Sequence, residues 1–519
     1  MSTHRPMAPR WLAGAWLLAA ATGGLAVAAA PDASMPPGAA CAQLPAVAPG
    51  NVRIGAATVV APAPRWLAPP VYGRQASVSA SFCRVEGVIE GRIGFELWLP
   101  EPAHWNGRLL GAGVGGDAGV YNYADMARGV DAGYATITND SGHKASEAHW
   151  MMRSEAVLDY THRSQHLMNQ AGRALVAAYY GQGAHHAYFI GCSGGGRQAL
   201  KEMQRFPEDY DGVIAGAGAP TMPIMSARHL WQALYQQRHP AGAMSDADWD
   251  IVAQAAVAAC DADDGVVDGV VEHPPSCHLP LRSLQCQDTK TAQCLSAAQL
   301  ATVRRFYAPL RDETGRALDS GLVPGVRTRP GPPSPLLLPL FAEGAHHDAG
   351  WRAEQFNIHD DLALVEREMP EMKADATDLR AFAARGGRAI LYQGWLDPSV
   401  VAGQSIDYVQ RVRRDLGARA TDGMLRLYMV PGMLHCGGGA GANLFGGMGD
   451  PRPIGAADAD LLTALTAWVE QQQAPRSITA VRLENGAITR RHPLCPWPQQ
   501  ARFLGGDGND PTRYRCGSR

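Results

Sequence analysis

The 519-residue sequence lacks several features that would assign it to a class at once. Beyond residue 30, no stretch approaches the ~20 apolar residues that a transmembrane helix needs. No block of Lys and Arg occurs and the formal net charge is −3, so neither nucleic acid nor an anionic membrane is an expected partner. There is no C-x-x-C pair, which argues against a zinc ribbon or a thioredoxin-like site, and there are no internal repeats.

The composition is that of a globular protein. Hydrophobic residues make up 46% of the chain and charged residues 18%. The length is too great for one ordinary core, so we expect either two domains or one domain with a large insertion.

The N-terminus is interpreted as a signal peptide over residues 1–28. A basic start precedes an apolar run over 11–28, which ends in an A-x-A cleavage site at 26–28. A retained membrane anchor is the alternative, but the run is short and rich in alanine and glycine. Cleavage would imply a secreted or periplasmic protein.

Export changes how the ten cysteines are interpreted. An even number in an oxidising compartment favours disulfides over thiol chemistry. Plausible local pairs are Cys260 with Cys277, Cys286 with Cys294, and Cys495 with Cys516. Spacing alone leaves the complete pairing open.

Short apolar runs that end in glycine or small polar residues predict a parallel α/β sheet. These runs cover 107–116, 134–142, 187–196, 212–220, 388–397 and 425–436. Residues 85–100 alternate about a glycine turn, as a hairpin would, while 157–180 and 460–475 have helical character.

The segment 220–379 breaks this rhythm. It holds four of the cysteines and a run with five prolines at 330–339. We interpret it as a lid inserted into a catalytic domain made of 29–219 and 380–519, and a separate domain with its own role is the alternative.

Gly191-x-Ser193-x-Gly195 has the form of a nucleophile elbow. Residues flanking such a serine must be small because the turn from strand to helix is tight. An apolar run precedes the motif and a helical segment follows it, which is the required context. A structural serine in a tight turn is the alternative.

A serine hydroxyl needs a base to take its proton, and the base needs a carboxylate to orient it. In α/β-hydrolases the chain order is serine, acid, histidine. Asp397 and His435 fit that order, because each follows a predicted strand at the end where sites in open α/β sheets form. His143 and His185 precede the serine, and we expect them to be surface or supporting groups.

Two cysteines stand beside these candidates. Cys192 directly precedes Ser193, and Cys436 directly follows His435. A disulfide holds its two Cα atoms about 4.4–6.8 Å apart, so a Cys192–Cys436 bridge would keep nucleophile and base together. Two unrelated buried cysteines would leave this symmetry unexplained.

An oxyanion hole needs backbone N–H groups near the reacting carbonyl oxygen. Gly194, directly after the serine, is the expected first donor. The glycine-rich stretch 111–119 is expected to supply the second, at Gly116 or its neighbour Gly115. As a phosphate-binding loop this stretch lacks the Lys-Ser/Thr of a P-loop.

An acidic loop follows Cys260. Asp261, Asp263, Asp264 and Asp268 fall within eight residues, so a cation is expected nearby, and oxygen ligands in a glycine-containing loop suit Ca²⁺. The spacing matches an EF-hand only in part. A solvated acidic turn is the alternative.

Three motifs together resemble the tannase and feruloyl esterase family: "GCSGGGR" at 191–197, "GWLDPSV" at 394–400 and "PGMLHCGG" at 431–438. The resemblance runs through most of the mature chain. It implies an α/β-hydrolase fold with a large inserted lid domain, Ser193 as nucleophile, Asp397 as acid and His435 as base.

The resemblance also implies a structural Ca²⁺ ion and a disulfide pattern. The ion would be bound by the carboxylates of Asp261, Asp264 and Asp268 and by the carbonyl oxygens of Val266 and Val270. The implied disulfides are Cys41–Cys83, Cys192–Cys436, Cys260–Cys277, Cys286–Cys294 and Cys495–Cys516.

These features predict an exported serine esterase for small esters of aromatic carboxylic acids, either hydroxycinnamates or gallates. Terephthalate half-esters are an alternative, although a family member that hydrolyses them has an acidic residue where this chain has Gly194. A catalytically silent binding protein and a peptidase on the same scaffold are further alternatives. The sequence does not specify the acyl group, the alcohol or the oligomeric state.

Overall fold

The computed structural model describes Met1 and residues 37–62, 64–71, 75–328 and 331–518. The predicted signal peptide, residues 1–28, therefore lies outside the described residues except for Met1. Within the described part of the chain, no helix has the length and apolar character needed to cross a membrane.

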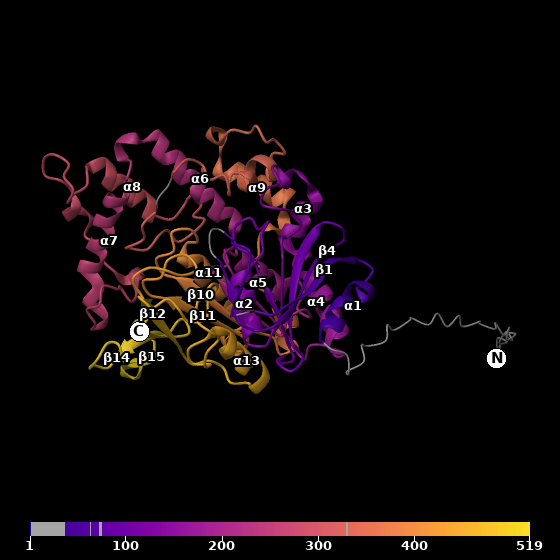
Figure 1. The fold of residues 1–519 in the computed structure, drawn as a ribbon. Helices are drawn as coiled ribbons and strands as arrows, with labels where there is room; N and C mark the ends of the chain where they lie inside the picture. The colour runs from indigo at the N-terminus through magenta and orange to yellow at the C-terminus, as the bar shows by residue number, and fades with distance from the viewer. Residues whose placement is uncertain (2–36, 63, 72–74, 329–330, 519) are drawn as a thin grey trace.

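One nine-stranded sheet forms the centre of the molecule (Figure 1). Its spatial order is β1 (Val52–Val60), β4 (Phe82–Ile89), β5 (Ile93–Pro100), β7 (Ala135–Asn139), β6 (Arg108–Ala112), β8 (His186–Cys192), β9 (Gly212–Gly216), β10 (Arg388–Gly394) and β11 (Leu425–Val430). The six strands from β7 to β11 are parallel, whereas β1, β4 and β5 pair antiparallel at one edge. The predicted parallel strands are thus all present, in a mixed sheet.

The predicted local elements have clear sequence causes. The hairpin predicted over 85–100 is β4–β5, and its turn places Glu90 and Gly91 at positive φ. The helical segment 157–180 is α3 (Ser154–Leu158), a π-helical stretch (Asp159–Arg163) and α4 (Ser164–Tyr180). The predicted C-terminal helix is α13 (Leu461–Gln471), capped by the Asp460 carboxylate.

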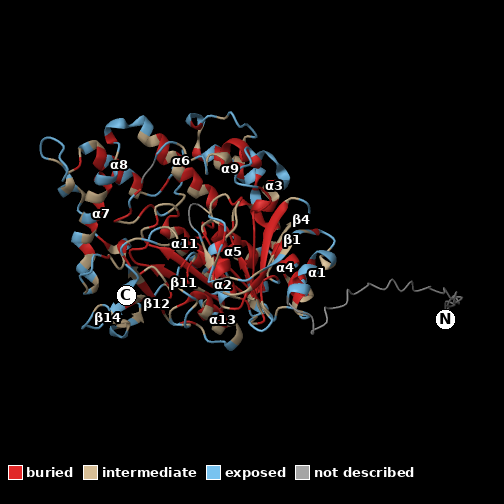
Figure 2. Cartoon of the chain, in the orientation of Figure 1, coloured by how far each residue is buried: buried red, intermediate tan, exposed pale blue. Residues whose placement is uncertain are grey.

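Helices cover both faces of the sheet, which explains why its central strands are continuous apolar runs. Side chains of α4, α5 (Gly194–Arg205) and α11 (Ala402–Leu416) pack in one large cluster with the sheet. On the other side lie α13 and α2 (Tyr123–Asp131). Figure 2 shows the strands as the buried centre of the molecule.

The chain leaves the sheet between β9 and β10, which pair directly with each other. The excursion returns where the N–H of Ala374 donates to the carbonyl oxygen of Pro220 at 2.9 Å. It contains α6 (Met222–Arg238), α7 (Asp246–Cys260), α8 (Ala297–Tyr307) and α9 (Ile358–Glu368), which lie together above the sheet in Figure 1. A small apolar cluster of its own, around Trp249 and Phe306, stabilises it. The predicted segment 220–379 corresponds closely to this excursion, and its role as a lid stays a prediction.

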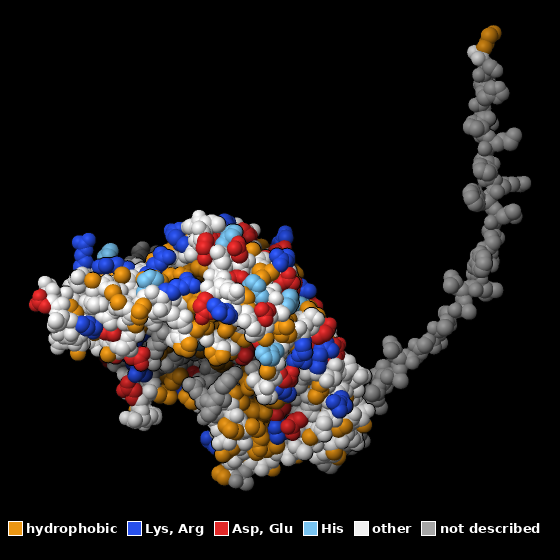
Figure 3. Space-filling view, turned by 90° about the horizontal axis from the view of Figure 1, so that it is seen from above, with side chains coloured by type: hydrophobic (Ala, Val, Ile, Leu, Met, Phe, Trp, Pro, Cys, Tyr) orange, Lys and Arg blue, Asp and Glu red, His pale blue; other side chains and the backbone are white. Residues whose placement is uncertain are grey.

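The remaining α-helices and β-strands of the described residues complete the fold. They are α1 (Pro37–Val47), β2 (Trp66–Leu67), β3 (Ser77–Val78), α10 (Arg380–Ala384), α12 (Ala418–Met424), β12 (Ile478–Glu484), β13 (Ala487–Leu494), β14 (Gln500–Phe503) and β15 (Tyr514–Gly517). On the face shown in Figure 3, basic and acidic side chains are interspersed rather than segregated.

Five disulfides link the chain. They join Cys41 to Cys83, Cys192 to Cys436, Cys260 to Cys277, Cys286 to Cys294 and Cys495 to Cys516, which is the predicted pattern. No cysteine in the described residues is free.

Candidate active site

The predicted elbow lies at the junction of β8 and α5. Ser193 is the N-cap of α5 and has φ 59° and ψ −121°, a strained conformation for a residue with a side chain. Its N–H donates to the carbonyl oxygen of Gly216 at 2.8 Å. Flanking glycines are required, because a Cβ on Gly191 would lie 2.5 Å from backbone atoms of Gly195. The turn therefore presents the serine at the carboxyl end of the sheet.

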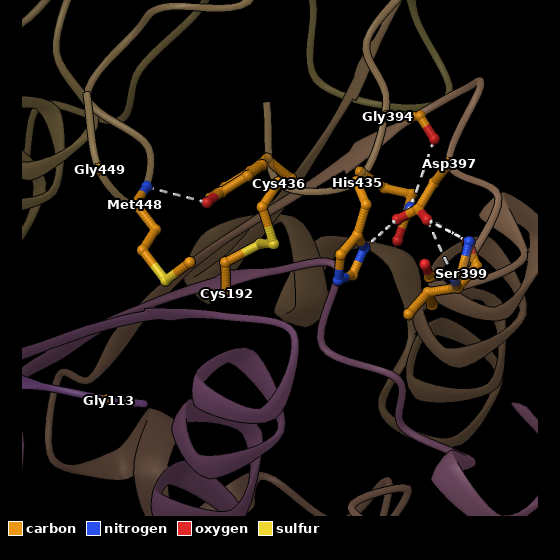
Figure 4. The surroundings of a disulfide bond; sticks show 12 residues. Gly113, Cys192, Gly394, Asp397, Ser399, His435, Cys436, Met448 and Gly449 are labelled. Atoms are coloured by element: carbon orange, nitrogen blue, oxygen red, sulfur yellow. Dashed lines mark hydrogen bonds and ion pairs between the residues drawn. A yellow bond between two sulfur atoms is a disulfide. The ribbon is translucent and has the colours of Figure 1, made fainter. Parts of the chain in front are cut away.

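The predicted acid and base come from the loops after two other parallel strands, β10 and β11. Asp397 follows β10 and His435 follows β11, and the His435 Nδ1 atom lies 2.8 Å from the Asp397 Oδ2 atom (Figure 4). The other carboxylate oxygen of Asp397 accepts hydrogen bonds from the N–H groups of Ser399, at 2.8 Å, and Val400, at 2.9 Å. Asp397 is buried, so these bonds hold it in one orientation.

The environment of His435 suits a base that works near neutral pH. Burial by itself lowers the pKa of the imidazole, but the charge and hydrogen bond of Asp397 outweigh burial and raise that pKa above its usual 6.5. The Nε2 atom has no hydrogen-bond partner among the described residues and is open to solvent. A neutral His435 with its proton on Nδ1 therefore offers a lone pair at Nε2.

The Cys192–Cys436 disulfide lies between the two candidate loops. Its Cα atoms are 6.0 Å apart although the cysteines are separated by 244 positions in the sequence. Cys436 has φ 61°, so both Ser193 and Cys436 have a positive φ, which residues with side chains rarely adopt. The covalent bond thus holds the residue before the serine beside the residue after the histidine.

The predicted oxyanion loop packs directly on the elbow. The N–H of Gly113 donates to Ile190, and the N–H of Val114 donates to the side chain of Gln198 in α5. The N–H groups of Gly115 and Gly116 have no partner among the described residues. Because the first N–H groups of a helix also lack internal partners, the N–H of Gly194 is a further free donor. The assignment of Gly194 and Gly116 as donors stays a prediction.

Several supporting residues were not recognised in the sequence. The Gln393 side chain donates to Asp397 Oδ2 at 2.9 Å. Its position four residues before Asp397 was the only sequence feature that could have indicated this contact. Arg197, at the end of the serine motif 191–197, donates to the backbone carbonyls of Tyr160 and Thr161. The Tyr160 hydroxyl in turn donates to Gly116 at 3.3 Å. No motif or residue spacing in the sequence indicated that Tyr160 contacts the predicted oxyanion loop.

His143 and His185, which precede the serine in the chain, have different surroundings. His185 is exposed, as expected of a surface group. His143 is 2% exposed and stacks on Trp150 with ring centroids 3.8 Å apart. Burial lowers the pKa of His143 to about 4, so this ring is neutral at physiological pH and belongs to the packing beneath the site.

A cavity of about 800 Å³ borders the oxyanion loop. Its lining includes Gly115, Tyr121 and the loop 448–454. Ser193 and His435 are not among its described lining residues. The cavity therefore lies beside the candidate catalytic group rather than around it.

Hydrogen bonds and basic side chains compensate part of the negative charge of the acidic loop. Asp261 accepts backbone hydrogen bonds from Asp268, Gly269 and Val270. Arg490 and His492 of β13 lie within 3.2 Å of Asp268 and 3.1 Å of Glu272. The expected cationic partners of the loop therefore include two side chains of the distant β12–β13 hairpin.

In the same loop, the charged form of the Asp264 carboxyl group is disfavoured. Burial, with contributions from Glu272 and Asp268, raises the pKa of Asp264 to about 6 despite the hydrogen bond from Val266. Among the described residues, no group of three or more His, Cys, Asp or Glu side chains is arranged to hold a metal ion. Carboxylate and carbonyl oxygens are the ligand type that Ca²⁺ prefers, and the calcium site in this loop stays a prediction.

The fold and the elbow define an α/β-hydrolase. A family model described as tannase and feruloyl esterase matches residues 77–328 and 344–516. The chain belongs to this tannase and feruloyl esterase family.

Relatives and solved structures agree with that assignment. The chain is 35% identical to an esterase of Xanthomonas campestris, with 92% of this chain and 91% of the other covered. It is 30% identical to feruloyl esterase C of Talaromyces stipitatus (86% and 88% covered) and 31% identical to mono(2-hydroxyethyl) terephthalate hydrolase of Piscinibacter sakaiensis (89% of each). The structure of feruloyl esterase B from Aspergillus oryzae superimposes with a TM-score of 0.86 at 25% identity, covering 93% of this chain and all of that one.

Proposed function

We propose that this protein is a serine esterase that hydrolyses esters of aromatic carboxylic acids through an acyl-enzyme. The single observation that carries the proposal is the bonded pair of His435 and Asp397, held by the Cys192–Cys436 disulfide next to the serine of a strained elbow. This arrangement supports Ser193 as nucleophile, His435 as base and Asp397 as the orienting acid.

The reaction takes two steps, acylation of the serine and hydrolysis of the acyl-enzyme. Ser193 Oγ attacks the ester carbonyl while His435 Nε2 takes its proton, and the same proton then passes to the leaving alcohol. Water, activated by His435, next attacks the acyl-enzyme and releases the carboxylic acid and the free serine. Asp397 stabilises the imidazolium in both steps and keeps the proton of the neutral ring on Nδ1. The N–H groups of Gly194 and Gly116 would stabilise the oxyanion.

Hydroxycinnamate or galloyl esters are the proposed substrate class. Support comes from family membership and from relatives that are named feruloyl esterases and that this chain matches over most of their length. The 31% identity to mono(2-hydroxyethyl) terephthalate hydrolase makes terephthalate half-esters the second candidate.

We also propose that the mature protein is secreted or periplasmic and that it binds structural Ca²⁺. Five disulfides favour an oxidising compartment. For the ion, Asp261, Asp264 and Asp268 would supply carboxylate ligands, and Val266 and Val270 carbonyl ligands. The raised pKa of Asp264 supports a site that a hard cation would stabilise. Calcium would hold the loop in shape and takes no part in the chemical steps.

The test combines labelling with a substrate series. A fluorophosphonate should modify the wild-type protein at Ser193, and Ser193→Ala should abolish both labelling and ester hydrolysis. Methyl ferulate, methyl gallate and a terephthalate monoester distinguish the acyl groups, and the matching amides test for peptidase activity. A silent binding protein would remain unlabelled, and undiminished hydrolysis by Ser193→Ala would refute the proposal.

A further inference from the structure

The first helix of the excursion, α6, contacts the loop that carries the acid. His229 in α6 lies with its Nε2 atom 3.0 Å from the carbonyl oxygen of Ser399. The N–H of Ser399 donates to Asp397 Oδ1 at 2.8 Å. Asp397 and His435 both act electrostatically on His229. A second imidazole, unused by the mechanism above, therefore lies beside the bonded pair.

The contact with Ser399 determines the tautomer of His229. A carbonyl oxygen can only accept a hydrogen bond, so Nε2 must carry the proton. Burial lowers the pKa of His229 below its usual 6.5, although the bond to Ser399 and the charge of Asp397 oppose this. The ring is therefore neutral at physiological pH, and its Nδ1 atom carries a lone pair that can only accept.

That lone pair has no partner within the described chain. Nδ1 of His229 makes no hydrogen bond there, and it is not one of the fully buried polar atoms that lack a partner, so it keeps some accessible surface. An acceptor that is left open beside the catalytic candidates is available to a bound molecule.

The helix is held firmly enough to make this acceptor specific. The preceding residue, Arg228, is buried and pairs with Asp319 at 2.5 Å. Arg228 also donates to the backbone carbonyl of Phe306 at 3.0 Å. Ala227 and Leu230, which flank Arg228 and His229 in the sequence, are buried in an apolar cluster. The imidazole therefore sits on a fixed helix rather than on a mobile loop.

We propose that His229 is a specificity-determining residue whose Nδ1 atom accepts a hydrogen bond from a hydroxyl group of the ester substrate. The inference rests on the proposed esterase function and extends it to the substrate. The hydroxyl belongs either to the aromatic ring of the acyl group or to the alcohol. Both are donors, whereas a methoxy group or an alkyl chain is not.

The experiment uses the full chain and two matched pairs of esters. Methyl 4-hydroxycinnamate and methyl 4-methoxycinnamate differ in the phenolic donor. The 2-hydroxyethyl and propyl esters of cinnamic acid differ in the donor on the alcohol. His229→Phe removes the acceptor at similar volume, while the amide of His229→Gln keeps one donor for Ser399 and one acceptor for the substrate.

In the wild type, the hydroxylated ester of one pair should have the higher kcat/KM, by about five- to tenfold for one neutral hydrogen bond. His229→Phe should bring that ratio close to one, and His229→Gln should restore part of it. The pair whose ratio changes identifies which hydroxyl is bound.

A purely structural role for His229 gives a different result. It would lower kcat/KM for all four esters by one common factor and leave both ratios unchanged, which would overturn the proposal. Should His229→Phe fail to fold, His229→Leu replaces it and the ratios are compared in the same way. Wild-type protein that hydrolyses none of the four esters would instead contradict the proposed function.

Discussion

At the scale of single residues, the site depends on backbone positions that tolerate no side chain. A Cβ on Gly194 would lie 2.6 Å from the carbonyl oxygen of Gly116 and 3.0 Å from that of Val114. Real Cβ atoms do not approach backbone so closely, so a side chain at 194 must displace the oxyanion loop.

The first prediction concerns Gly194→Ala. We expect kcat to fall by about 10²-fold with a small change in KM, because a displaced oxyanion donor affects the transition state more than the ground state. Steady-state kinetics with a methyl ester checks this. Gly437→Ala is the matched control, since a Cβ there meets nothing within 4 Å. An unchanged kcat in Gly194→Ala would show that the loop does not carry the oxyanion donor.

The second prediction concerns pH. Only neutral His435 is a base, so kcat/KM should fall as the pH drops through its pKa, and Asp397 holds that pKa above 6.5. Asp397→Asn removes the charge that raises the pKa and leaves the burial that lowers it. The acid limb should therefore shift to lower pH while the maximal rate falls by about 10³- to 10⁴-fold.

A pH–rate profile of both proteins measures this shift. Asp407→Asn is the control, because Asp407 is a surface carboxylate paired with Arg411. An acid limb that stays in place in Asp397→Asn would mean that another group titrates.

At the scale of elements, the loops after β8 and β11 are joined by a covalent bond. The third prediction is that replacing both Cys192 and Cys436 by alanine lowers kcat as well as stability. Loop-entropy arguments give about 5 kcal/mol for a bridge across so long a loop. The loss of kcat follows because the strained backbone at Ser193 is no longer held beside the loop of His435.

The control for the third prediction is the bridge between Cys495 and Cys516, which closes a separation of only 21 residues near the C-terminus. Its removal should lower the melting temperature and leave kcat unchanged. Kinetics below both melting temperatures separate the two effects. Full activity in the folded Cys192/Cys436 double variant would show that packing alone positions the base.

At the scale of the whole molecule, the acidic loop connects the excursion to the β12–β13 hairpin through Arg490 and His492. The fourth prediction is that removing Ca²⁺ lowers the melting temperature before it affects kcat, because the proposed ion is structural. The pH dependence has a definite sign. A folded-state pKa of about 6 for Asp264 means that its ionisation disfavours the folded state as the pH rises from about 4 through 6.

The effect of a chelator on the melting temperature should therefore be larger at pH 7.5 than at pH 5. Thermal unfolding with and without the chelator measures it. Asp264→Asn removes both the anion and a proposed ligand, so its stability should depend less on calcium. Equal chelator effects at both pH values would indicate that Asp264 does not contact the ion.

Much of this molecule was already determined by the sequence. The strands, the hairpin and the serine elbow were predictable because apolar runs, turn glycines and a strand-to-helix junction are local features. Asp397, His435 and the Cys192–Cys436 bridge could be proposed because chain order and two adjacent cysteines reduced the choices. The sequence did not reveal that Arg490 and His492 meet the acidic loop, that Tyr160 bonds to Gly116 or that His229 lies beside the bonded pair of Asp397 and His435. Those contacts join residues distant in sequence, and no local pattern records which of many buried or charged side chains will meet once the chain has packed.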